Sequence, residues 1–109
     1  MALLRPMDVV ETTIESGLDY TEAEPVHVRV RQRGRRFELL DDGRAVELAG
    51  RPAGWRERAN AVAEAYDLNV NREGVVFVPA VEGGVDREWL AGRVAETSLA
   101  LYDALLELE

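Results

Sequence analysis

Residues 35–50, RRFELLDDGRAVELAG, contain the turn on which the predicted fold depends. The dipeptide Asp42-Gly43 lies between alternating apolar residues, and this pattern is typical of a two-residue β-hairpin. Type I′ hairpin turns need positive φ at both central positions, which aspartate and glycine tolerate better than most residues. A turn at this dipeptide places four apolar side chains on one face of a sheet: Phe37, Leu39, Val46 and Leu48.

A short helix over residues 44–49 is the alternative structure for the second half of this stretch. Asp41 or Asp42 is a suitable N-cap for such a helix, and Gly50 is a suitable residue just after its end. We favour the strand, because the hairpin gives one consistent set of inward-facing residues.

Residues 26–31 alternate between apolar and polar side chains, which predicts a half-buried strand. A loop around Gly34 then places Val30 opposite Phe37 in the following strand. The inward-facing residues are the same ones that the Asp42-Gly43 turn selects. Together the two turns predict a three-strand meander.

Apolar residues recur at helical spacing in three other segments. They predict helices over residues 6–16 and 54–66, and a third helix from an N-cap at Asp86 to the carboxyl end. Residues 68–78 between the last two helices have the pattern of a second hairpin, in which a four-residue loop pairs Val70 with Val75. The sequence therefore predicts a single α+β domain over residues 1–109, with an antiparallel sheet packed with helices in the order α-βββ-α-ββ-α.

Composition and charge limit the classes of function. The chain has 109 residues, no cysteine and a formal net charge of −8. The lack of cysteine excludes disulfides and thiol catalysis. No apolar run approaches the roughly 20 residues that span a bilayer, and the amino-terminal residues lack the apolar stretch of a secretory signal. We therefore expect a cytoplasmic protein with no membrane partner, and the negative charge argues against nucleic acid as a partner.

The predicted carboxyl-terminal helix is apolar around most of its circumference. A helix of this kind must be covered on two sides, one by the sheet and the other by the amino-terminal helix or a second subunit. We expect a homodimer in which the second apolar stripe contributes three contact residues: Leu99, Tyr102 and Leu106.

Five arginines gather on the predicted hairpin over residues 29–36, and they are the candidate anion or partner contacts: Arg29, Arg31, Arg33, Arg35 and Arg36. The predicted register places Arg31 opposite Arg36 and Arg29 opposite Glu38. A like-charge pair is destabilising unless an anion or an acidic partner lies between the two guanidinium groups. The alternative is an ordinary solvated face balanced by the acids of the chain.

No pattern of an active site is present in the sequence. His27 is the only histidine, so one chain cannot build a histidine-based metal site, and we expect no catalytic residue, cofactor or metal. Asp41 and Asp42 could in principle ligate a magnesium ion or act as an acid–base pair. A metal-dependent enzyme built on these two carboxylates is our third functional hypothesis. It ranks below the other two because turn formation also explains both residues.

Two resemblances accompany these patterns. The predicted element order, the segment RERANAVAEAYDLNVNREGVVFVP (residues 56–79) and the long closing helix resemble the fold of type III secretion chaperones and the bacterial proteins that share it. That resemblance implies a dimer that binds partner polypeptides without catalysis. Separately, FELLDDG (residues 37–43) with Leu48 and Gly50 is similar to an uncharacterised bacterial domain family, which implies a helix over residues 44–49.

The leading hypothesis is thus a small acidic, non-enzymatic protein-binding or chaperone-like module that acts as a homodimer. The alternative is an anion- or nucleic-acid-binding protein that uses the arginine-rich hairpin.

Overall fold

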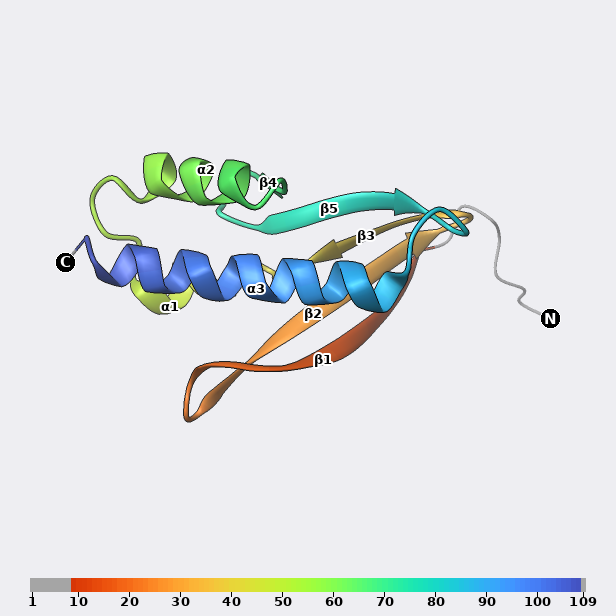
Figure 1. Ribbon diagram of the computed structural model, residues 1–109, viewed down its shortest axis with the longest axis horizontal. Coiled ribbons are helices and arrows are strands. Elements are labelled where there is room, and N and C mark those ends of the chain that lie inside the picture. The colour runs from red at the N-terminus through yellow and green to blue at the C-terminus, as the bar shows by residue number, and fades with distance from the viewer. Residues whose placement is uncertain (1–8, 109) are drawn as a thin grey trace.

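A five-stranded antiparallel sheet forms one layer of the molecule (Figure 1), in a computed structural model that describes residues 9–108. The strand order across the sheet is β1-β2-β3-β5-β4. The α+β class and the antiparallel sheet predicted from the sequence are confirmed. The strand bounds are β1 Val9–Thr21, β2 Glu24–Arg33, β3 Arg36–Leu40, β4 Asn69–Val70 and β5 Val76–Val81.

The described residues also form three helices: α1 (Arg44–Ala49), α2 (Trp55–Ala65) and α3 (Arg87–Leu106). The long helix α3 runs along one face of the sheet (Figure 1) and contacts strands β1, β2, β3 and β5, while α1 and α2 pack against α3. Asp86 is the N-cap of α3, as predicted, and its carboxylate accepts the backbone N–H groups of Glu88 and Trp89. Within residues 9–108, no helix has the length and apolar character needed to cross a membrane.

The core lies between α3 and the sheet, and the alternation of β2 supplies much of it. Val26, Val28 and Val30 are each at most 1% exposed. The other face of the sheet, here called the open face, carries the intervening side chains Arg29 and Arg31, which are half-exposed. The predicted division of this strand into inward and outward residues is confirmed.

The register between β2 and β3 differs from the prediction by two residues. Val30 pairs with Leu39, and Phe37 pairs with Gln32, because the turn contains only two residues and brings Arg33 opposite Arg36. A slip of two residues keeps every side chain on its predicted face, whereas a slip of one would reverse them all. Despite the two-residue error in register, Phe37 and Leu39 were correctly predicted to face the core, where both are buried.

The helix predicted over residues 6–16 is wrong for the residues that the structure describes, since residues 9–16 belong to β1. The part of this prediction that covers residues 6–8 lies outside the described chain. The apolar residues Val10, Ile14 and Leu18 are spaced by four, which places them on one face of a strand as well as on one face of a helix. Pairing of β1 with β2 and the β-branched residues of this segment decide for the strand.

The strand predicted after the Asp42-Gly43 turn is also wrong, because residues 44–49 form helix α1. Asp42 and Gly43 do have positive φ (60° and 73°), but they lead into a helix and not into a hairpin. The place beside β3 is taken by β5, which pairs Val78 with Leu39. The helical alternative, which the second resemblance implied, is the structure that forms.

The second hairpin is present with a longer loop than predicted. Val70 pairs with Val76 in place of Val75, and β4 contains only two residues. The extra loop residue is stabilised by Asn71, whose side-chain oxygen accepts the N–H groups of Glu73 and Val75.

Gly74 in this loop permits close packing of α1 and α2, and its substitution provides a test of that packing. Gly74 has φ of +89°, and an added Cβ would lie 2.8 Å from Val46 Cγ2 and 3.0 Å from Trp55 Cζ3. Gly74→Ala is expected to lower the free energy of unfolding by roughly 2–5 kcal/mol, from the left-handed backbone and from overpacking. Gly50→Ala, also at positive φ but with no atom within 4 Å, is expected to lose only about 1–2 kcal/mol. Urea denaturation of both variants measures the difference, and equal losses would contradict the packing explanation.

Candidate functional site

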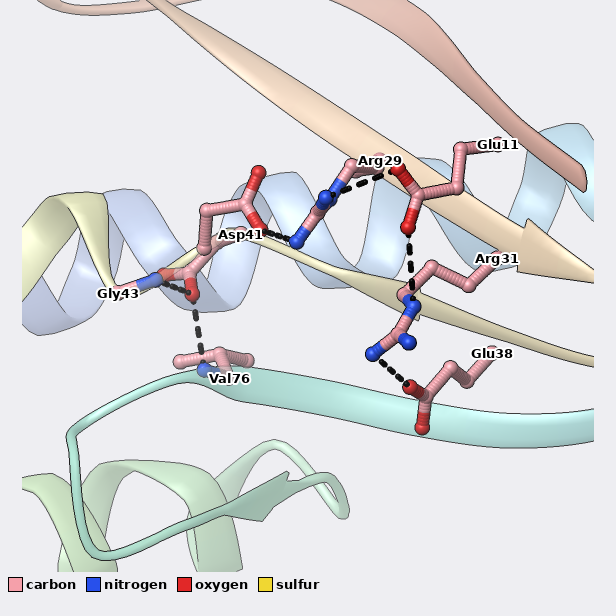
Figure 2. A network of polar contacts seen from close by, with 8 residues as sticks. Glu11, Arg29, Arg31, Glu38, Asp41, Gly43 and Val76 are labelled. Carbon is pink, nitrogen blue, oxygen red and sulfur yellow. Dashed lines mark hydrogen bonds and ion pairs between the residues drawn. The ribbon is translucent and has the colours of Figure 1, made fainter. Parts of the chain in front are cut away.

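The open face of the sheet carries an ordered array of ion pairs (Figure 2). Arg29 lies 3.2 Å from Glu11. It also lies 2.6 Å from Asp42. Arg31 lies 3.2 Å from the same Glu11 and 3.6 Å from Glu38. Two of the five predicted contact arginines are therefore already paired with carboxylates within the fold.

Glu11 was not predicted to lie near the arginines, because its segment was expected to be a helix. In the structure it is the β1 partner of Arg31, and Glu38 is the β3 partner of the same arginine. Arg29 pairs with Leu40 and not with Glu38 as predicted. Glu11 could have been placed beside the arginines only by predicting that its segment is a strand paired with β2.

The remaining three arginines, Arg33, Arg35 and Arg36, lie at the turn between β2 and β3. All three are exposed, and within residues 9–108 no carboxylate lies within ion-pair distance of them. Arg36 is opposite Arg33, so the predicted pairing of Arg31 with Arg36 is wrong. A like-charge arginine pair does exist, with Arg33, two residues further along β2, in the place of Arg31. Such a pair favours an anion placed between the two guanidinium groups.

A single row across the sheet places this pair between two apolar side chains. Val9 of β1 pairs with Arg33, Arg33 with Arg36, and Arg36 with Val81 of β5. Val9 and Val81 are 37% and 50% exposed, which is high for valine. The row therefore presents two positive charges flanked by exposed aliphatic surface.

A shallow depression of about 680 Å³ lies over this end of the open face. We call it the arginine groove. Its lining includes cationic and aliphatic side chains, and one carboxylate, Glu38, which is paired with Arg31: Val9, Arg31, Arg33, Arg36, Glu38, Pro79 and Val81. Guanidinium groups bind carboxylates and phosphates through paired hydrogen bonds, and the aliphatic lining can bury apolar side chains of a ligand.

The predicted dimer face on α3 is partly used within the chain. Leu99 and Tyr102 are half-buried and pack against the core, while Leu106 is 41% exposed. The Tyr102 ring packs edge-on against Tyr20, with 5.5 Å between the ring centroids. The second side of α3, predicted to need a cover, is covered in part by the end of β1 and by the short helices.

A second polar cluster lies inside the molecule, around Asp41. This carboxylate is 2% exposed and accepts the N–H groups of Gly43 and Val76, each at 2.8 Å (Figure 2). Its other oxygen accepts the Ser98 hydroxyl at 2.5 Å, and the Tyr20 hydroxyl lies 2.5 Å from Ser98. Because Ser98 donates to Asp41, Tyr20 donates to Ser98.

Burial dominates the electrostatics of this cluster. Desolvation raises the pKa of Asp41 to about 6, and the hydrogen bonds from Ser98, Gly43 and Val76 only partly oppose that rise. Burial likewise raises the pKa of Tyr20 well above its usual value. The carboxylate thus carries a cost of burial that its hydrogen bonds only partly offset.

Asp41 and Asp42 do not form a joint site. Asp41 is directed into the core and bonded to backbone groups, whereas Asp42 pairs with Arg29 on the open face. Within the described residues, no group of three or more histidine, aspartate or glutamate side chains is arranged to hold a metal ion. The geometry gives the metal-dependent hypothesis no support.

Comparison with protein-family models, with curated proteins and with solved structures finds no match to this chain in any of the three.

The raised pKa of Asp41 predicts an unusual pH dependence of stability. Well below the ordinary aspartate pKa of about 3.9 the carboxyl group is protonated in both states, and as the pH rises toward 6 the unfolded chain releases its proton first. Ionisation therefore removes about 3 kcal/mol of stability between about pH 4 and pH 7. Asp41→Asn keeps an oxygen acceptor for the two N–H groups and is expected to remove this loss, so that the variant gains relative to wild type as the pH rises.

The measurement is urea denaturation of wild type and variant across pH 4–8, compared as a difference between the two profiles. Asp42→Asn, which changes an exposed neighbouring carboxylate, is the matched control and should not produce the same difference. Parallel profiles for wild type and Asp41→Asn would contradict the burial effect.

Proposed function

We propose that this protein is a non-catalytic, chaperone-like binding module that acts as a homodimer and holds an acidic polypeptide segment in the arginine groove. The observation that carries the proposal is the row of Val9, Arg33, Arg36 and Val81. It sets two guanidinium groups, which have no ion-pair partner among residues 9–108, between two exposed aliphatic side chains. An acidic side chain between the arginines, with apolar neighbours, matches both parts of this surface.

Charge supports an acidic ligand at this site. The whole chain has a net charge of −8, so an acidic partner is repelled by most of the molecule and attracted only where arginines lack carboxylate partners. Arg29 and Arg31 are neutralised by their neighbours, which leaves the turn between β2 and β3 as the cationic end of the open face. This contrast supports one oriented binding site over diffuse attraction.

The lining of the groove favours a polypeptide over single-stranded nucleic acid. Nucleic-acid grooves combine positive charge with exposed aromatic rings on which bases stack. Here the exposed apolar side chains are valines, and the ring of Phe37 is only 4% exposed, with the Arg87 guanidinium 4.7 Å from its centre.

Binding of a labelled peptide in which glutamate alternates with valine tests the proposal. The double variant Arg33→Ala/Arg36→Ala is expected to weaken binding at least about tenfold, because each charge-assisted hydrogen bond contributes about 1.5–3 kcal/mol. Fluorescence anisotropy at low and high salt measures the affinity, which should fall with ionic strength.

The matched control is Arg51→Ala/Arg72→Ala, which removes the same charge from two exposed arginines outside the groove lining. This control should retain most of the affinity. Equal losses in the two double variants would overturn the groove as the site, and tighter binding of a single-stranded oligonucleotide than of the peptide would favour the nucleic-acid alternative.

A further inference from the structure

Strand β1 is an open edge of the sheet. It is 13 residues long and contains no proline, and among residues 9–108 it pairs with β2 alone. Its first five residues, Val9–Thr13, are all exposed, and its pairing with β2 is regular from Val9 to Glu15. Unpaired N–H and C=O groups on such an edge form a template for a further strand.

The opposite edge of the sheet is not suited to the same role. There β4 contains only two residues, and β5 carries Pro79, which has no N–H group to donate. The sheet can therefore be extended at β1 far more readily than at its other side.

We propose that β1 pairs antiparallel with β1 of a second copy of this chain, with the two-fold axis at Thr12, so that one continuous sheet crosses the dimer. This inference rests on the homodimer of the proposed function and adds to it the surface that joins the two copies.

Charge and hydrophobicity along β1 select this register. A two-fold axis at Thr12 places Val10 opposite Ile14 of the second copy, and Glu11 opposite Thr13. It also places Val9 opposite Glu15, so that a carboxylate of the second copy lies at the β1 end of the row that contains Arg33. Val10 is 43% exposed in the single chain, so the pairing covers an apolar side chain that has little other contact. Residues on the core side then face one another across the axis, and the α3 helices of both copies lie on the same face of the joined sheet.

Neighbouring registers are less favourable. An axis at Thr13 sets Glu11 opposite Glu15 of the second copy, and an axis at Glu11 sets this residue opposite itself, so both bring carboxylates together. An axis at Ile14 runs into the irregular pairing between Glu15 and Asp19. Registers that pair odd with even positions, such as Glu11 with Ile14 or Glu11 with Thr12, place the two α3 helices on opposite faces of the joined sheet.

Substitutions at the axis give a direct test. In the Thr12→Lys dimer two ammonium groups face each other, and in the Thr12→Glu dimer two carboxylates do so. Because like charges repel, either variant should raise the dimer dissociation constant at least about tenfold. An equimolar mixture of the two variants should form a dimer again, because opposite charges then meet at the axis. Thr13→Lys is the matched control, since its lysine lies opposite Glu11 of the second copy and should leave dimerisation intact or strengthen it.

Sedimentation of the full chain over a range of concentrations measures these constants, and circular dichroism checks that each exposed threonine variant is folded. A dimeric wild type, weakened by both Thr12 variants and rescued by their mixture, supports the inference. A dimer that resists both Thr12 variants but is dissociated by Leu106→Arg would overturn the β1 interface and place the contact on α3. A mixture that stays monomeric would overturn the axis at Thr12.

A wild type that is monomeric at all concentrations would overturn both this inference and the homodimer of the proposed function. Peptide binding in the arginine groove is measured independently, so its outcome does not depend on that result.

Discussion

The buried carboxylate of Asp41 fixes the path on which the other elements depend. It accepts the N–H groups of Gly43 and Val76, which lie 33 residues apart in sequence, and the hydroxyl of Ser98 on α3. One side chain therefore turns the chain out of β3 into α1, holds the start of β5 beside the end of β3, and attaches both to the long helix. Burial of this carboxylate is energetically unfavourable, and its hydrogen bonds to backbone groups of two segments only partly compensate. The same hydrogen bonds specify how the two segments are arranged.

The arginine groove is a consequence of this topology. When β5 pairs with β3, Val81 comes opposite Arg36, and Pro79 comes opposite Glu38. A chain that continued from Asp42-Gly43 into a hairpin would place other side chains beside β3, and the aliphatic wall formed by β5 would be missing. The site on the open face thus depends on a polar contact within the core.

Sequence patterns predicted correctly those elements for which the pattern is compatible with only one type of secondary structure. The alternation of β2 and the N-cap at Asp86 fall in this class. The spacing of Val10, Ile14 and Leu18 fits a helix and a strand equally, and only the pairing with β2 decides between them. The choice between helix α1 and a strand could not be made from the local sequence either. It depends on the hydrogen bond that Asp41 accepts from the backbone N–H of Val76, which is distant in the sequence. The arginines were placed on their correct face, but their carboxylate partners follow from strand pairings that no local pattern contains.

Position within the sheet explains why only some arginines are available to a ligand. Arg31 lies between two strands that both supply glutamates at its level, Glu11 and Glu38, so its charge is neutralised from either side. One row further, the flanking strands supply valines, and the two central positions are both arginine. The same outward alternation along β2 therefore produces an ion-pair network in one row. In the next row it produces two arginines that have no carboxylate partner in the part of the chain that the structure describes. Because Val9 belongs to that row and also begins the open edge of β1, the strand that borders the groove is the strand through which a second copy would extend the sheet.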